Sequence, residues 1–256
     1  MNAENTELAL DCFLLAGRIM IESGAETYRV EDTMNHILKT SKVEQIDALA
    51  LMTGITVTLN DSELEQPISM VRTIDSRSTN MNNIIKVNGI SRSYCAGKIS
   101  LQEANEQLKC VKEKLYSRTQ FNIATVLVGT GFAMMFGGTF LDVLFATIMG
   151  VWLSGCITFA KIKKIDTLVQ DVVSCAGIAL FTILIQAYFF PQLDADIVIV
   201  SAFMPIVPGV AITNAIRDTL QGDYLSGCAR MLEAFLKAAS VAVGAGLGMA
   251  IGGMIL

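Results

Sequence analysis

Residues that could bind a metal are scarce in this sequence. Its 256 residues include one histidine, His36, and six cysteines that form no Cys-x-x-Cys pair. A zinc site needs several histidine or cysteine ligands at close spacing, and a disulfide framework needs paired cysteines. We therefore predict no metal site, no disulfide and no cofactor, and we expect reduced, buried thiols.

The sequence also lacks the short motifs of common enzymes. It has no Gly-x-Ser-x-Gly motif and no glycine-rich phosphate loop ending in Lys-Ser or Lys-Thr. The loop 75–80, Asp-Ser-Arg-Ser-Thr-Asn, has residue types that a hydrolase uses but lacks a companion histidine. Loop chemistry explains that composition equally well. No catalytic residue is predicted, and the chain is not expected to be an enzyme.

Charged residues are few in the second half of the chain. Residues 121–256 hold 6 of the 19 Lys and Arg and 8 of the 24 Asp and Glu. We therefore predict a soluble domain at 1–120 and a membrane-embedded domain at 121–256. The net charge of −5 provides no basic surface, so nucleic acid is not an expected partner. The acidic, polar start of the chain predicts no cleaved signal peptide.

The predicted fold class is a cytosolic α+β domain followed by an all-α membrane domain of about five transmembrane helices, one of them broken. In the first domain, two capping boxes, Ser23 with Glu26 and Ser100 with Glu103, indicate helix starts. Periodicity predicts helices at 6–22, from the Ser23 cap to about Lys39, at 81–95 and from 100 to about 114, with strands at 46–51, 55–59 and 68–72.

The second half contains five apolar stretches, each near the roughly 20 residues that span a bilayer. In the last stretch, Gly244, Gly248 and Gly252 recur every four residues. Small residues at this spacing let helices approach closely in lipid, either within this chain or against another. The stretches are 121–140, 143–160, 172–190, 197–216 and 234–256.

The fourth stretch contains Pro205, Pro208 and Gly209 where a membrane helix should be continuous. Proline removes a helical hydrogen bond, so this spacing predicts a broken helix. Broken spans with polar contacts are typical of secondary transporters. The restarted helix would present bare amides and a partial positive charge to an anion at Gly209. The alternative is a proline kink that binds no ligand.

Polar residues follow this break. Thr213, Asn214 and Arg217 share one helical face, and Asp218 adjoins it. An arginine can bind a carboxylate with two parallel hydrogen bonds. Equally, Arg217 and Asp218 could anchor the helix at the membrane interface. The hypothesis names these substrate-binding residues: Pro205, Pro208, Gly209, Thr213, Asn214, Arg217 and Asp218.

The loops between the predicted spans differ in charge. Lys161, Lys163 and Lys164 follow the second span, and Arg217 and Arg230 follow the fourth. Because cytoplasmic loops are enriched in Lys and Arg, both loops are predicted to face the cytoplasm. Five spans would then place the N-terminus inside and the C-terminus outside in a multi-pass plasma membrane protein.

Two motifs together resemble the threonine/serine exporter family. They are Ser-Gly-Ala-Glu-Thr-Tyr-Arg-Val-Glu at 23–31 and Pro-Ile-Val-Pro-Gly-Val-Ala-Ile-Thr-Asn-Ala-Ile-Arg-Asp at 205–218. The first motif forms either a polar cluster beside a helix turn or a cap with a solvated helix face. Its candidate residues are Ser23, Gly24, Glu26, Thr27, Arg29 and Glu31.

The resemblance implies export of small polar metabolites, driven by the proton-motive force. Threonine and serine are the substrates of the founding type, and split members are associated with the dicarboxylate succinate. A chain ending at Leu256 resembles the larger subunit of a split exporter, with a smaller membrane subunit as partner. The sequence leaves open whether the chain also forms a homo-oligomer. The alternative function is a membrane-anchored cytosolic sensor or hydrolase-like domain without transport of its own.

Overall fold

The structure, a computed structural model, describes residues 3–40, 45–60, 66–111 and 116–256. The chain divides into two compact units. The first comprises Met1–Glu113 with Val210–Met231, and the second comprises Lys114–Gly209 with Leu232–Leu256. Residues 210–231 thus belong with the N-terminal part of the chain, although the sequence places them beside the membrane spans.

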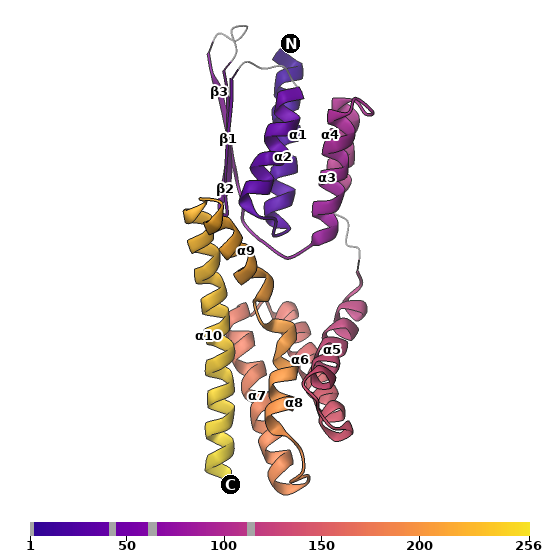
Figure 1. Cartoon of the computed structure of the whole chain (residues 1–256), viewed down its shortest axis with the longest axis vertical. Coiled ribbons are helices and arrows are strands. Elements are labelled where there is room, and N and C mark those ends of the chain that lie inside the picture. The colour runs from indigo at the N-terminus through magenta and orange to yellow at the C-terminus, as the bar shows by residue number, and fades with distance from the viewer. Residues whose placement is uncertain (1–2, 41–44, 61–65, 112–115) are drawn as a thin grey trace. The chain divides into compact units, whose positions relative to one another are not determined.

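The first unit combines helices with one small sheet (Figure 1). Its helices α1 and α2 pack on each other, α1 also packs on α3 and α4, and α2 packs on β1. Helices α9 and α10 cross the boundary between the units. The elements are α1 (Ala3–Glu22), α2 (Thr27–Thr40), β1 (Gln45–Leu51), β2 (Gly54–Asn60), β3 (Ile68–Thr73), α3 (Met81–Cys95), α4 (Leu101–Cys110), α9 (Gly209–Leu220) and α10 (Tyr224–Ile255).

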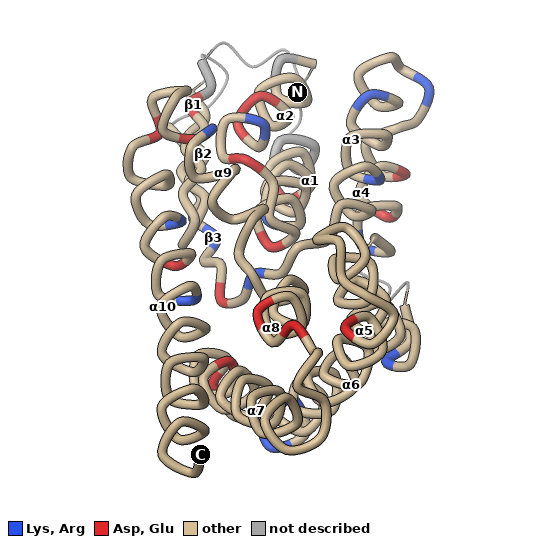
Figure 2. The backbone as a smooth tube through the Cα atoms, turned by 60° about the horizontal axis from the view of Figure 1, so that its bottom comes forward, with Lys and Arg blue, Asp and Glu red and all other residues tan. Residues whose placement is uncertain are grey.

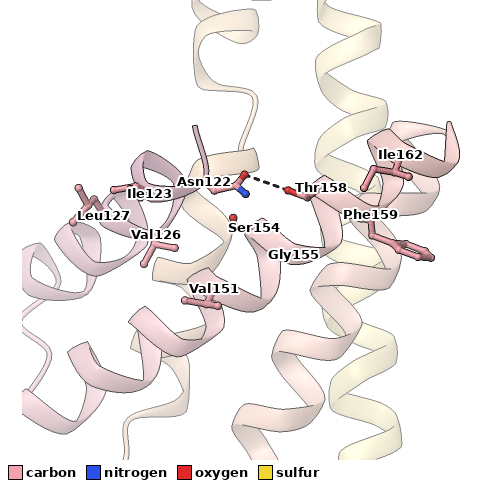
Figure 3. Close-up of a pocket in the computed structure, with 10 residues that line it drawn as sticks. All are labelled: Asn122, Ile123, Val126, Leu127, Val151, Ser154, Gly155, Thr158, Phe159 and Ile162. Carbon is pink, nitrogen blue, oxygen red and sulfur yellow. Dashed lines mark hydrogen bonds between the residues drawn. The ribbon is translucent and has the colours of Figure 1, made fainter. Parts of the chain in front are cut away.

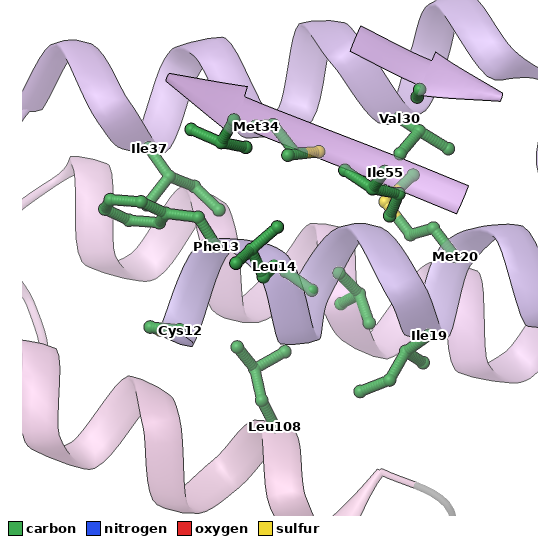
Figure 4. Close-up of a cluster of buried hydrophobic side chains, with 14 of the residues drawn as sticks. Cys12, Phe13, Leu14, Ile19, Met20, Val30, Met34, Ile37, Ile55 and Leu108 are labelled. Atoms are coloured by element: carbon green, nitrogen blue, oxygen red, sulfur yellow. The ribbon is translucent and has the colours of Figure 1, made fainter. Parts of the chain in front are cut away.

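The sheet is antiparallel, with the strand order β1-β2-β3. Residues alternate between its two faces, so Ile55, Val57 and Leu59 of β2 all point into the core. Figure 4 shows this core, where Phe13 and Met34 lie among other buried side chains of the helices. The three predicted strands are confirmed, because the alternation of apolar residues sets which face is buried.

Local signals at helix ends are partly confirmed. Gly97 adopts φ 67° just after α3, and the Ser100–Glu103 capping box begins α4. The end of the helix predicted to reach residue 114 lies outside the described residues. The Ser23–Glu26 capping box is wrong, because α2 begins at Thr27 and Glu26 directly precedes the helix. Glu26 is therefore not at the third helical position that a capping box requires.

The second unit is built of helices in the residues that the structure describes. Its buried residues include Leu153 of α6, Ile178 of α7 and Val198 of α8, which form one apolar cluster. Figure 2 shows how few charged residues α6, α7 and α8 carry. The elements are α5 (Arg118–Met135), α6 (Phe140–Lys163), α7 (Thr167–Tyr188), α8 (Ala195–Phe203), the 3₁₀ helix η1 (Met204–Ile206) and the remainder of α10.

The predicted fold class is wrong. Within the described residues, three helices are long and apolar enough to cross a membrane, namely α6, α7 and α10, or up to four if α8–η1 and α9 count as one broken span. The stretch 121–140 fails as a span because α5 ends at Met135 and includes Arg118, Gln120 and Asn122. A separate α+β domain followed by a five-helix membrane domain is therefore not what the chain forms.

The expected break in the fourth stretch is present. Helical structure stops after η1, Val207 is extended with φ −60° and ψ 129°, and α9 begins at Gly209. The Gly209 amide donates to the Val207 carbonyl at 2.9 Å. The expectation of a bare amide at Gly209 is therefore wrong, because the turn itself uses this donor.

The glycine stripe of α10 packs within this chain, against α7. A methyl group added at Gly244 would lie 2.5 Å from the Val172 carbonyl oxygen. One added at Gly248 would collide with the Ala176 carbonyl and the Ala179 side chain. Only glycine allows the two backbones to approach this closely, so the stripe determines how α7 and α10 pack.

Candidate functional site

The two motifs identified in the sequence meet in the first unit. Each residue of the turn 24–27 forms a hydrogen bond or an ion pair with a side chain from residues 214–230. Asn214 Nδ2 donates to the Gly24 carbonyl at 3.0 Å, and Arg230 Nη2 donates to the Ala25 carbonyl at 3.0 Å. We call this set of residues, 24–27 with Asn214, Arg217, Asp218 and Arg230, the turn cluster.

A buried ion pair forms the centre of the turn cluster. Asp218 is fully buried, and its Oδ2 accepts a hydrogen bond from Arg230 Nε at 3.1 Å. Its Oδ1 accepts the Thr27 amide at 3.0 Å. Thr27 is the first residue of α2, where amides lack helical partners and the helix dipole favours a negative charge. Asp218 thus caps α2 from 191 positions further along the chain.

Glu26 forms a second ion pair nearer the surface. Arg217 Nη1 lies 2.8 Å from Glu26 Oε1, and Arg29 Nη1 lies 3.3 Å from Oε2. Burial opposes ionisation of Glu26, but a backbone hydrogen bond, the bond from Arg217 and both guanidinium charges together lower its pKa. Because the pKa of Glu26 is lowered in the folded state, the interactions of its carboxylate stabilise the fold at neutral pH. That stabilisation is lost as the pH falls through the folded-state pKa.

A polar loop supports the same turn. The Ser78 amide donates to the Glu22 carbonyl at 2.8 Å, and the Asn80 amide donates to the Ser23 carbonyl at 3.0 Å. The side chain of Asn80 also caps α3, and Arg77 donates to the Met52 carbonyl. The backbone of the loop 75–80 thus holds the turn in place, while the side chains of Arg77 and Asn80 bond to other segments.

The remaining predicted residues lie elsewhere. Ser23 is buried in the turn itself, and Glu31 accepts the Ala50 amide at 2.9 Å, which joins α2 to β1. Burial raises the pKa of Glu31. Thr213 is exposed on α9, and Pro208 is buried just before α9. The structure therefore brings Gly24, Glu26, Thr27, Arg29, Asn214, Arg217 and Asp218 together, but not the whole predicted set.

Arg230 is the main residue that sequence reasoning missed as a site residue. It is 7% exposed and contacts both Asp218 and Ala25. The sequence offered one signal, an arginine within the otherwise apolar stretch Cys-Ala-Arg-Met-Leu at 228–232. An arginine in such a setting is usually paired, because an unpaired buried charge is costly.

Pro205 lines a pocket within the second unit. The pocket has a volume of about 260 Å³, and its lining contains several charged and polar side chains. They are Thr125 of α5, Lys161 of α6, Lys164 directly after α6, Thr167, Gln170 and Asp171 of α7, and Lys237 of α10. A break in an apolar helix thus borders a cavity with charged and polar residues in its lining. Non-helical backbone is tolerated at membrane depth where it lines a water-filled cavity or is buried in protein.

A larger groove runs between α5 and α6, shown in Figure 3. It has a volume of about 660 Å³. Its lining is mostly apolar, with small residues at Ser154 and Gly155 and a hydrogen bond of 3.2 Å from Thr158 Oγ1 to Asn122 Oδ1. Open space surrounds Gly155, because a methyl group added there meets no atom within 4 Å.

The charged side chains of these sites suit the binding of charged ligands. Within the part of the chain that the structure describes, no group of three or more His, Cys, Asp or Glu could hold a metal. The turn cluster holds paired charges, and the pocket at Pro205 holds lysines beside one aspartate. Such groups recognise carboxylates and ammonium groups through charge-assisted hydrogen bonds.

Comparisons with known proteins identify the family of the chain. The family model described as "Putative threonine/serine exporter" matches residues 11–252. A protein of Mycobacterium tuberculosis (strain ATCC 25618 / H37Rv) described as "Probable threonine/serine exporter" is 22% identical over 245 residues, which are 94% of this chain and 45% of that protein. No solved structure matches the chain. Since the family model covers nearly all of its length, the chain belongs to the threonine/serine exporter family and is a membrane protein.

Proposed function

We propose that this chain is a subunit of a secondary transporter that exports small carboxylate-bearing metabolites across the plasma membrane. The candidates are threonine, serine and dicarboxylates such as succinate. The observation that carries the proposal is the broken helix at 204–208 in a family member whose neighbouring helices are apolar enough to span a bilayer. A helix that serves only as an anchor has no need of such a break.

The roles proposed for the broken helix must take its contacts into account. Asn214 donates to Gly24 and Arg217 pairs with Glu26, so each would have to exchange that partner to bind a carboxylate. Arg217 can do so most easily, because 57% of its side chain is exposed. We propose that Arg217 helps substrate to enter and that Asn214 and Asp218 couple α9 to the turn 24–27.

A second membrane subunit is also part of the proposal. The chain spans about 45% of the length of the relative that it matches. The groove between α5 and α6 is mostly apolar and has small residues at Ser154 and Gly155, which membrane helices use to associate closely. We propose that a helix of the smaller subunit occupies this groove.

Transport by the reconstituted protein tests the proposal. Proteoliposomes that contain this chain with the smaller subunit are expected to show counterflow of serine, threonine or succinate. The chain alone is expected to transport at a small fraction of that rate, because in this proposal the smaller subunit supplies part of the pathway. Full-rate counterflow by the chain alone would contradict the two-subunit arrangement. Absence of counterflow for every tested carboxylate, in a folded complex, would contradict the exporter function.

Orientation can be tested separately. The lysines at 161, 163 and 164 favour a cytoplasmic position for the α6–α7 connection. In sealed right-side-out cells, a single cysteine introduced at Lys163 should therefore react with an impermeant maleimide only after the cells are opened. Labelling in intact cells would reverse the proposed orientation. The native cysteines must first be replaced, since Cys95, Cys110 and Cys228 are exposed.

A further inference from the structure

The pocket at Pro205 has two lysines without an ion-pair partner among the described residues. Its charged lining residues are Lys161, Lys164, Asp171 and Lys237. Lys237 interacts electrostatically with Asp171, so these two charges offset each other. Lys161 and Lys164 belong to none of the ion pairs of the described residues. Three lysines and one aspartate give the lining a formal charge of +2, which favours an anionic ligand.

The fold places both lysines at this pocket. The ammonium of Lys161 lies 4.2 Å from the centre of the ring of Phe121, which also lines the pocket. Lys164 directly follows α6 with φ 54°, a conformation for which glycine or asparagine is favoured. The helix dipole favours a cation at this end of α6, but Lys163 already supplies one there and does not line the pocket. The dipole alone therefore does not explain the two lysines of the lining.

Exposed apolar side chains adjoin these charges. Phe121 and Ile165 line the pocket and are 47% and 41% exposed. Ile162 and Leu168, close to them in the chain, are 59% and 37% exposed. In a membrane protein, such side chains are in contact with hydrocarbon. The pocket thus combines cations with apolar surface, which fits a ligand that joins an anionic group to hydrocarbon chains.

We propose that this pocket binds the phosphate of an anionic membrane lipid, with Lys161 and Lys164 as its cations. The acyl chains would lie on the exposed apolar side chains beside it, so only the headgroup needs to enter the volume of about 260 Å³. The cytoplasmic leaflet carries a negative surface charge, which agrees with the cytoplasmic position proposed for the α6–α7 connection. The inference uses the membrane location of the chain and is independent of what the chain transports.

A soluble anion is the competing occupant. Inorganic phosphate offers the same charge to the lysines but has no hydrocarbon to place on Phe121 and Ile165. Burial of acyl chains adds to the attraction between charges, so a lipid is expected to bind more tightly than inorganic phosphate.

Thermal unfolding of the full chain in mixed micelles tests the proposal. Phosphatidylglycerol is anionic, whereas phosphatidylcholine with the same acyl chains has no net charge. We expect phosphatidylglycerol to raise Tm, because a ligand that binds the native state stabilises it. Phosphatidylcholine at the same mole fraction, and inorganic phosphate at matched ionic strength, should leave Tm unchanged. The mole fraction of phosphatidylglycerol that gives half of the Tm shift measures its affinity.

Replacing the lysines tests the site. The pair Lys161→Gln with Lys164→Gln should weaken phosphatidylglycerol binding about tenfold or more, since each lysine attracts the anionic headgroup. Arg118→Gln with Lys163→Gln is the matched control, because it removes two cations from the same unit and neither residue lines the pocket. This control should retain binding. Lys161→Arg with Lys164→Arg should also retain it, because arginine keeps the charge and binds phosphate with two parallel hydrogen bonds.

The arginine pair separates loss of charge from damage to the fold. If it loses binding as the glutamine pair does, charge is not what holds the lipid. Equal weakening by the pocket pair and the control pair would indicate general attraction to surface charge and refute the pocket. A rise in Tm with inorganic phosphate as large as that with phosphatidylglycerol would assign the site to a soluble anion. Wild-type protein that does not respond to phosphatidylglycerol would also refute the proposal, and none of these results depends on counterflow.

Discussion

Replacing Arg230 with methionine is expected to destabilise the first unit severely. Asp218 is fully buried, and Arg230 is the cation that pairs with it at 3.1 Å. Methionine fills similar space but leaves the carboxylate buried, with the hydrogen bond from the Thr27 amide still in place and no cation paired with it. Breaking a buried ion pair by removing one partner costs about 3–5 kcal/mol. The Ala25 carbonyl loses its hydrogen bond from Arg230 as well.

Thermal unfolding of the purified protein measures this effect. We expect Arg230→Met to lower Tm on the order of 10 °C. The double variant Asp218→Asn with Arg230→Met should recover part of the loss, because no charge is then left buried without its partner. Arg217→Met is the matched control, since it removes a cation from a carboxylate but at a side chain that is 57% exposed. Its expected effect is about 0–1 kcal/mol.

Equal effects of Arg230→Met and Arg217→Met would contradict this account of the turn cluster. A double variant whose loss of stability equals the sum of the losses in the two single variants would also contradict it. In either case burial of the Asp218–Arg230 pair would not be what makes Arg230 important.

Much of the local structure could be predicted from the sequence. The boundaries of α3, at Met81 and Cys95, follow from helical periodicity and from Gly97 just beyond its end. The three strands follow from alternation of apolar residues. Pro205 and Pro208 locate the break, because proline cannot continue a helix without losing a hydrogen bond. Each of these signals lies within a few residues of the feature that it predicts.

The number of spans was harder to predict because it depends on small differences in composition. Residues 121–135 are largely apolar, but α5 begins three residues earlier and includes Arg118 and Gln120. Those residues lower the mean hydropathy of α5, and the helix ends at Met135 before further apolar residues could raise it again. A scan that follows apolar runs places the segment at 121–140 and joins it to residues that belong to the turn before α6.

The pairing of residues in the turn cluster could not be predicted from local signals. Both motifs were visible, yet nothing local connects Thr27 with Asp218, which are 191 positions apart. The sequence explains Ser23 and Glu26 as a capping box, whereas the carboxylate that caps α2 comes from α9. The sequence therefore identified the residues of the turn cluster but not their pairing, because capping requires only a carboxylate in the right place and not one nearby in the chain.

Replacing Gly248 with alanine is expected to separate α10 from α7. The added methyl group would collide with the Ala176 carbonyl and would lie 2.9 Å from the Ala179 Cβ atom and 3.0 Å from the Leu180 nitrogen. Two of these three atoms belong to the backbone, which cannot turn aside as a side chain can. Overpacking a tight contact costs about 1–3 kcal/mol. We expect a lower Tm and a weakened contact between the two helices.

Gly246→Ala in the same helix provides a control with the opposite expected sign. A methyl group at Gly246 meets no atom within 4 Å, so alanine adds no collision there. Alanine is also favoured over glycine inside a helix by about 1 kcal/mol. Gly246→Ala should therefore leave Tm unchanged or raise it, while Gly248→Ala lowers it. If both substitutions stabilise the protein, helix propensity outweighs the close approach, and the glycine stripe is not what holds α10 against α7.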